Sequence, residues 1–255
     1  SCRTSAKDIF AGGDAVTAEE PATPPSPARP PKPGEGREGK ADLGRKARHF
    51  RLWYEKTGPA VYLSQLELQA VLERSLRRAR VPLTFSQGYH PLPLISFAKA
   101  LPVGVASLCE FVDIFVRRDM SGEALQGALG PLLPRGLSLT RVDELGLEKR
   151  QPQPVLEEFE LRLLRAEAKW PEALRCWESF AQSAQHVWFR VTAKGARSRD
   201  IRPLFRDVAI VAPDHVLLGL DWLQGYCNPL AMVREIMPGM ELDEFNLTKV
   251  RVDLG

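Results

Sequence analysis

The chain has few cysteines, and none of them are paired. Cys2, Cys109, Cys176 and Cys227 lie far apart, and no C-x-x-C pair occurs. A secreted disulfide scaffold would carry a denser set, so the composition predicts a protein of the reducing cytoplasm. The C-x-x-x-C-x-x-C triad of a 4Fe–4S cluster is missing too, and cluster ligation needs closely placed thiolates. We expect no cofactor in this chain, and we expect its last three cysteines to be buried packing residues.

Long apolar runs are also missing. No stretch of about eighteen apolar residues occurs, so the sequence predicts no membrane span. The N-terminus is polar and then rich in proline, unlike a signal peptide. Neither sign of charge dominates, because 35 Lys and Arg residues face 32 Asp and Glu residues. That balance permits a nucleic-acid partner without demanding one.

Recognised catalytic motifs are absent as well. The chain has no G-x-S-x-G, no H-E-x-x-H and no dinucleotide fingerprint. Lys56-Thr57-Gly58 lacks the remainder of a phosphate-binding loop. His90 has no second His or paired Cys nearby, so no metal role is expected for it. These absences favour a chain that holds a molecule over one that transforms it.

A Pro-rich segment opens the chain. Seven prolines fall between Pro21 and Pro33. Such a segment cannot bury enough apolar surface to offset the entropy of ordering it. We expect residues 1–46 to form a disordered linker, with a tail of no function as the alternative.

The remaining residues show the order strand, helix, strand, strand, helix, strand twice. Ser64 and Glu67 form a capping-box signature for the first helix, and Pro82 ends it. The polar segment 146–154 separates the two sets. The expected strands lie at 50–54, 83–85, 94–97, 110–116, 137–142, 159–165, 187–191, 208–211, 216–220 and 247–254, and the expected helices at 64–79, from Ser121, from Pro171 and from Asn228 to Pro238. The predicted fold is α+β, with two tandem ferredoxin-like (split βαβ) units at 47–145 and 154–255.

Several motifs of the first half occur in a known family. They are Tyr54-x-Lys56-Thr57-Gly58-Pro59, Leu63-Ser64-x-Leu66, Leu72-Glu73-Arg74-x-Leu76-Arg77-Arg78-Ala79 and, most distinctive, Phe85-Ser86-Gln87-Gly88-Tyr89-His90-Pro91. With these motifs the sequence resembles the radical-SAM-linked protein family, a bacterial domain family. The resemblance covers about 50–255 and weakens after about 150.

The resemblance implies a radical SAM partner, because the family's domain is often fused behind such an enzyme or encoded beside it. The Pro-rich segment and the first residue, Ser1, fit the C-terminal part of a fusion. The iron–sulfur cluster and SAM are then expected on the partner only. The family's own substrate is not implied.

Basic and aromatic residues of the first half are candidates for binding. Arg74, Arg77 and Arg78 share one side of the predicted helix and suit phosphate groups. Alternatively they form a solvated face in which Glu73 pairs with Arg77. In the following loop, Gln87, Tyr89 and His90 could contact an RNA base, with Tyr89 stacking on it, or the aromatic residues could pack over the sheet edge.

A second basic cluster lies around Asp200. Its members are Lys194, Arg197, Arg199, Arg202 and Arg206. They could track a nucleic-acid backbone, or they could belong to a charged, exposed hairpin. The binding candidates of the whole chain are Lys56, Arg74, Arg77, Arg78, Gln87, Tyr89, His90, Arg199 and Arg202.

Three functions are compatible with the sequence. The first is a non-catalytic accessory domain that binds RNA for a radical SAM enzyme. The second is an RNA- or nucleotide-modifying enzyme with a cleft that joins Asp113, His90 and either Lys56 or Asp200. Asp113 could equally face solvent or pair with an arginine. The third is a protein-docking domain, which needs an apolar, uncharged face.

Overall fold

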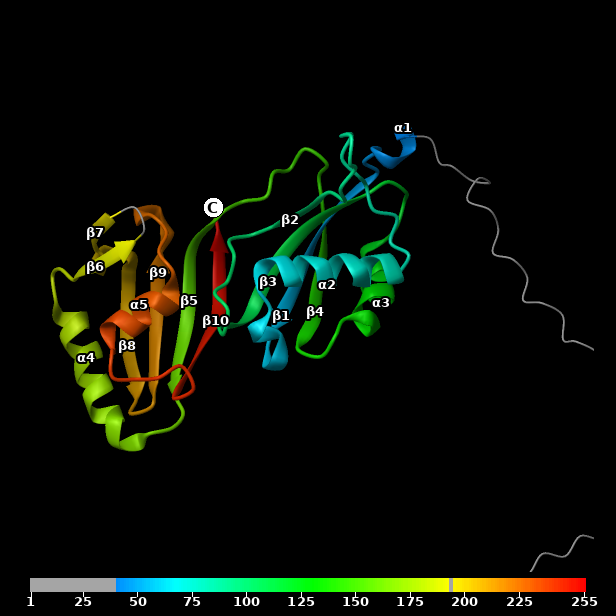
Figure 1. Cartoon of the computed structure of the whole chain (residues 1–255). Helices are drawn as coiled ribbons and strands as arrows, with labels where there is room; N and C mark the ends of the chain where they lie inside the picture. The colour runs from blue at the N-terminus through cyan, green and yellow to red at the C-terminus, as the bar shows by residue number, and fades with distance from the viewer. Residues whose placement is uncertain (1–39, 193–194) are drawn as a thin grey trace, which may run out of the picture. The chain divides into compact units, whose positions relative to one another are not determined.

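The computed structural model describes residues 40–192 and 195–255. Most of the predicted linker over 1–46 lies outside the described residues. At its end, Lys40–Leu43 forms a short helix, α1. The described part combines helices with a large mixed sheet, which confirms the predicted α+β class (Figure 1).

The helices and strands agree with the predicted series in most places. Their bounds, after α1, are β1 (Arg48–Lys56), α2 (Gln65–Arg78), β2 (Ile95–Phe97), β3 (Ala106–Val116), α3 (Gly122–Leu129), β4 (Leu137–Leu145), β5 (Pro154–Leu163), α4 (Trp170–Gln182), β6 (Val187–Thr192), β7 (Gly195–Asp200), β8 (Phe205–Ala212), β9 (His215–Asp221), α5 (Pro229–Ile236) and β10 (Phe245–Leu254). The capping box of Ser64 and Glu67 forms as predicted at the start of α2. The expected strand at 83–85 is wrong, since Leu83 and Phe85 make only isolated bridges. Strand β7 was not predicted.

One sheet runs through both halves of the chain. Its strand order is β4-β1-β3-β10-β5-β9-β8, and β2 pairs with β3. Strands β3 and β10 are parallel and pair at only two positions, Ala106 with Thr248 and Ser107 with Lys249. The other pairings are antiparallel. The last strand of the described chain therefore joins the two halves. Two separate ferredoxin-like units remain a prediction.

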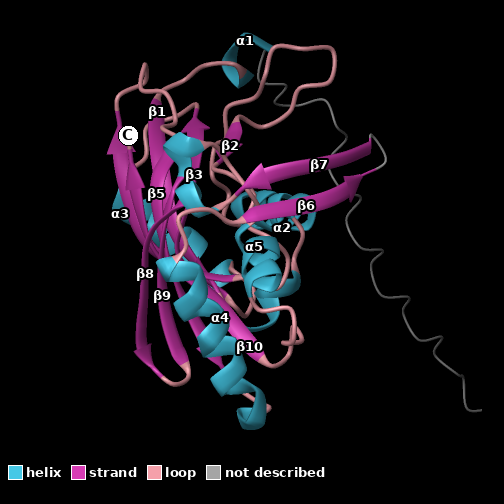
Figure 2. Ribbon diagram, turned by 90° about the vertical axis from the view of Figure 1, so that its left-hand side faces the viewer, coloured by secondary structure: helices cyan, strands magenta, loops and turns pink. Residues whose placement is uncertain are grey.

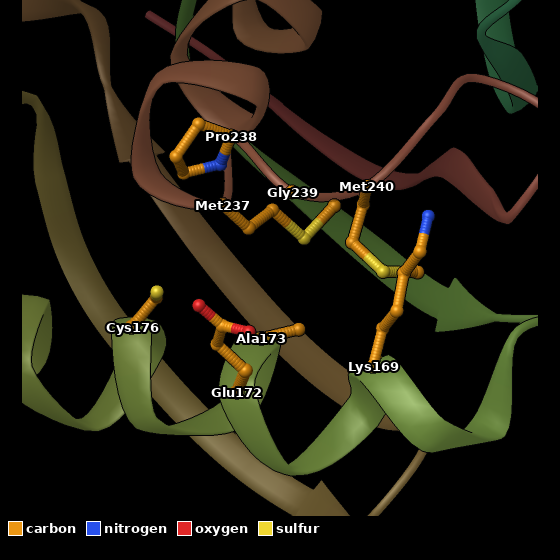
Figure 3. A pocket seen from close by; sticks show the side chains of 8 residues that line it. All are labelled: Lys169, Glu172, Ala173, Cys176, Met237, Pro238, Gly239 and Met240. Atoms are coloured by element: carbon orange, nitrogen blue, oxygen red, sulfur yellow. The ribbon is translucent and has the colours of Figure 1, made fainter.

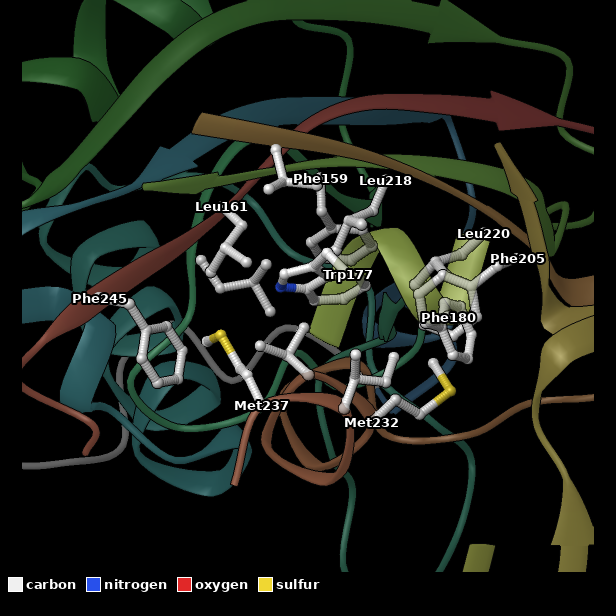
Figure 4. Packing of buried hydrophobic residues seen from close by; sticks show 14 of the residues in the cluster. Phe159, Leu161, Trp177, Phe180, Phe205, Leu218, Leu220, Met232, Met237 and Phe245 are labelled. Atoms are coloured by element: carbon white, nitrogen blue, oxygen red, sulfur yellow. The ribbon is translucent and has the colours of Figure 1, made fainter. Parts of the chain in front are cut away.

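Each half has its own apolar core. Phe50, Leu52 and Ile114 pack under α2 and α3, as alternation along β1 and β3 requires. The second core surrounds Trp177 of α4 and includes Phe159 (Figure 4). The indole Nε1 of Trp177 is buried and has no hydrogen-bond partner among the described residues. The burial of so large a ring compensates for that unpaired group.

Buried charges lie where the two halves meet. The Lys249 ammonium contacts the carboxylate of Glu110 and lies 3.1 Å from an oxygen of Glu157, and all three side chains are buried. The indole of Trp222 donates to Glu157 at 2.9 Å. Burial alone would lower the pKa of Lys249, but the two carboxylates outweigh burial and raise it above its ordinary value. This ion cluster fixes β10 against β3 and β5.

Candidate functional site

Exposed arginines mark the C-terminal end of α2. Arg74, Arg78 and Arg80 are exposed, and we call these three residues the basic edge. Arg77, between them, pairs with Glu73 at 2.6 Å, as the solvated-face alternative predicted. The guanidinium of Arg78 donates to the carbonyl of Leu132 at 2.5 Å, which holds this side chain at the surface. The basic edge therefore presents positive charge that Glu73 does not neutralise.

Arg80 has an unusual backbone conformation. The N–H of Arg80 donates to Arg77 and that of Val81 to Leu76, which is the Schellman pattern of a helix end. The residue at this position adopts a left-handed conformation, and glycine is the usual choice because it has no Cβ. Here it is arginine, at φ +55°. Ala166 is the other non-glycine with positive φ in the described ranges.

The loop after α2 presents an aromatic side chain to solvent. Ser86 and Leu92 close it, because the N–H of Ser86 donates to the Leu92 carbonyl at 2.8 Å and the N–H of Leu92 to the Ser86 hydroxyl at 3.0 Å. Tyr89, at the far side, is 94% exposed, and its ring meets that of His90 edge-on at 4.8 Å. Packing of Tyr89 over the sheet edge is therefore wrong. Gln87 is exposed beside it.

The base of the loop contacts the last turn of α2. The guanidinium of Arg77 lies 5.9 Å from the ring centre of Phe85, at the base of the loop. This contact joins the last turn of α2 to the base of the loop, whose far side carries the exposed ring of Tyr89. Positive charge together with an exposed aromatic ring is the combination with which proteins hold the phosphates and bases of single-stranded nucleic acid.

A two-stranded hairpin carries a second set of arginines. Strands β6 and β7 pair only with each other, and their hairpin projects on the side of α2 and α5 (Figure 2). Arg190 and Arg197 stand directly opposite each other, an arrangement that destabilises an isolated hairpin. The guanidinium of Arg190 lies 5.0 Å from the Trp188 ring, and Phe189 is exposed. Sequence reasoning missed Arg190, because the pairing of β7 that brings it beside Arg197 has no local signal.

Other predicted binding residues turn inward. Arg199 donates to the carbonyls of Tyr226 and Gln224, at 2.7 and 3.0 Å. Arg202 donates to three backbone carbonyls at 2.8 to 3.2 Å. Lys56 is 1% exposed, and burial lowers its pKa. The structure thus gives all three a role inside the fold, and Lys194 lies outside the described residues.

The residues of the predicted catalytic cleft do not meet in the described structure. Both carboxylate oxygens of Asp113 accept from the guanidinium of Arg51, at 2.8 and 2.9 Å, so its expected pairing with an arginine is confirmed. Lys56 lies five residues further along the same strand as Arg51, about 17 Å away. Asp200 accepts from two backbone N–H groups, and His90 lies in the exposed loop.

Two further hollows lie elsewhere. One, of about 170 Å³, separates α4 from the turn after α5 and is lined by Cys176 and Met237 (Figure 3). The other, of about 440 Å³, is an apolar groove with the exposed side chains of Tyr62 and Leu242 at its rim. The three described cysteines are half-buried, so the prediction that they are buried packing residues is only partly met. The described ranges contain no group of three His, Cys, Asp or Glu residues that could bind a metal.

No helix among the described residues is both long and apolar enough to cross a membrane.

Comparisons with known proteins identify a family. None of the curated proteins compared with the chain gives a significant match. One solved chain, from the "Crystal Structure of a Cbf5-Nop10-Gar1 Complex", is similar with 11% identity and a TM-score of 0.39. The alignment covers 84% of this chain and 50% of that chain, so this chain spans about half the length of the one it matches. The model of uncharacterized proteins conserved in bacteria (DUF2344) matches residues 49–228, well over half of the chain. The chain belongs to this bacterial family.

Proposed function

We propose that this chain is a non-catalytic module that holds RNA for a radical SAM enzyme. The observation that carries the proposal is the exposed ring of Tyr89 in the loop that follows the exposed arginines of the basic edge along the chain. Guanidinium groups bind phosphates, and an exposed aromatic ring stacks on an unpaired base, for about 1–3 kcal/mol per base. The two opposed arginines of the β6–β7 hairpin supply a second point of contact for the backbone.

Single-stranded RNA fits this surface better than a duplex does. A ring that stands in solvent reaches only bases that are already unstacked, as in loops and at strand ends. The closed loop keeps its shape before binding, which lowers the entropy lost on association. The arginines give affinity for any sequence, so selectivity depends on the loop.

The radical SAM partner is inferred from the family resemblance of the first half. The chain carries no thiolate triad of its own, so the cluster and SAM belong to the partner in this proposal. We place both proteins in the cytoplasm, where unpaired cysteines stay reduced.

We further infer that each half is a ferredoxin-like unit. Two strand orders support this inference. The first half has the order β4-β1-β3-β2 and the second β10-β5-β9-β8, which is the same order with the β6–β7 hairpin inserted before β8. Such small sheets carry many unrelated functions, so the RNA proposal does not depend on this inference.

Binding of a short single-stranded RNA at several salt concentrations tests the proposal. The logarithm of the association constant should fall linearly with that of salt, by about 0.7 for each phosphate contacted. Arg74→Gln should reduce this slope by about one contact, and Tyr89→Ala should weaken binding at every salt concentration without changing the slope. Arg175→Gln removes an exposed arginine of α4 and should change neither. The proposal would be refuted if Arg74→Gln and Tyr89→Ala both bound RNA as well as the unchanged chain does.

A further inference from the structure

The opposite face of the first half contains a polar cavity. Alternation along the strands places Phe50 and Ile114 towards the helices, so His49, Arg51, Asp113 and Phe115 point to the other face. No helix of the described chain packs on them. Even so, His49, Arg51 and Asp113 are 1%, 4% and 2% exposed.

The segment that joins β4 to β5 covers these residues. It must cross from one edge of the first half to the second half, and it does so at the end of the sheet where β1 begins (Figure 1). The Gly146 carbonyl lies 3.1 Å from His49 Nδ1, and the Gln151 amide donates to the Ser96 carbonyl at 2.8 Å. Between this segment and the strands lies a cavity of about 320 Å³.

One buried group in this cavity lacks a hydrogen bond. The ring of His49 stacks on Phe115 at 4.1 Å, and its Nδ1 faces a carbonyl, so Nδ1 carries a proton. Its Nε2 is buried and makes no hydrogen bond within the described structure, and its ionic neighbour, an oxygen of Asp113, is 3.5 Å away. Arg51 already engages both oxygens of that carboxylate. A group bound in the cavity would give Nε2 a hydrogen-bond partner.

The charges of the cavity favour an anion. Lys46, Lys149 and Arg150 line it, against Glu148 and the already paired Asp113. The Lys46 ammonium lies 4.3 Å from the centre of the Phe115 ring, which also lines the cavity. Three cations suit the oxygens of a phosphate group.

We infer that this cavity is a binding site for a phosphate-bearing ligand of mononucleotide size. Its volume lies at the lower end of the range for small-molecule sites, about 300–1,000 Å³, and exceeds what phosphate alone needs. Phosphate oxygens accept from the lysine and arginine side chains of the covering segment, and a ribose hydroxyl of the ligand donates to His49 Nε2. The ligand is either a free nucleotide or the terminal nucleotide of an RNA, since both present the same group.

Binding of three probes to the full chain tests this site. The probes are inorganic phosphate, adenosine 5′-monophosphate, and one short RNA with and without a 5′-phosphate. Saturable binding of the monophosphate indicates a free ligand, and binding of RNA that depends on its 5′-phosphate indicates a strand end. Either result supports the site. If none of the probes binds in a way that depends on its phosphate group, the proposed site is overturned.

Variants of exposed residues avoid the risk of unfolding. Lys149→Ala with Arg150→Ala should weaken binding about tenfold or more, and Arg234→Ala on α5 should leave it unchanged. The ¹⁵N signal of His49 Nε2 should shift on binding, which reports contact directly. Binding that survives the double variant, or that leaves this signal unmoved, overturns the site. The basic edge of α2 is not part of this cavity, so Arg74→Gln should not affect it.

Discussion

Replacement of Arg80 by glycine should change the stability of the fold and the affinity for RNA in opposite directions. The left-handed conformation of a residue with a Cβ costs about 1–2 kcal/mol, and glycine removes this strain. Glycine also gives the unfolded chain more conformational freedom, which lowers the free energy of unfolding by about 0.5–1 kcal/mol. The net expectation is a variant more stable by about 0.5–1 kcal/mol. For a described unit of this size, Tm then rises by roughly 1–4 °C.

The same change should weaken the binding of RNA. It removes one guanidinium from the basic edge, so we expect a loss of about 1 kcal/mol, or roughly fivefold in affinity, and a salt slope smaller by about 0.7. Thermal unfolding and RNA titration of the same samples measure both effects. Two controls isolate them. Ala166→Gly relieves the same strain elsewhere and should raise Tm without changing affinity, and Arg80→Lys should change neither by much.

Two results would refute this reasoning. A lower Tm for Arg80→Gly would mean that the arginine side chain stabilises the fold through contacts that outweigh its backbone strain. An unchanged affinity would mean that the charge at the helix end does not contact RNA. A higher Tm together with weaker binding would show that the strain is retained for function.

Three further predictions concern buried groups. Lys249→Ala leaves the carboxylates of Glu110 and Glu157 buried and uncompensated, so we expect a loss of about 3–5 kcal/mol in chemical denaturation, and Lys249→Arg should lose less. Burial and the charge of Glu110 raise the pKa of Tyr54, so above pH 10 the unfolded chain loses a proton that the folded chain keeps. The free energy of unfolding should therefore fall above pH 10, by up to about 1.4 kcal/mol per pH unit, and Tyr54→Phe should make this fall shallower. Partial burial raises the pKa of the Cys109 thiol to about 11, so in a chain without the other three cysteines its alkylation rate should climb until pH 11. A plateau near pH 8 would contradict this raised pKa.

Local signals predicted much of the fold. The capping box at Ser64 and Glu67 depends only on neighbouring residues, so it could be read directly from the sequence. The proline after Asn228 marks the start of α5 for the same reason. Strand β3 begins earlier than expected, because Ala106 and Ser107 pair with β10, and Ser107 also with Lys56 of β1, both far away in sequence.

The candidate site depended more on tertiary context. The exposure of Tyr89 and the pairing of Glu73 with Arg77 were both among the predicted alternatives, since helical spacing and a Pro-rich loop suggest them. No local sequence pattern distinguishes the buried Lys56 from the exposed Arg74. The burial of Lys56 depends on β3 and β4, which pair with its strand. The cavity beside His49 was not predicted, since a connection that crosses the sheet creates it.

The position of β10 has a consequence for biosynthesis. This strand is the last of the described elements to be made, yet it lies between β3 and β5. Until it emerges from the ribosome, β5 keeps a long edge with unpaired backbone groups, and β3 keeps two such positions, which invites contact with other nascent chains. The second half must therefore wait, partly assembled, for β10. A chaperone that shields those two edges would act during this interval.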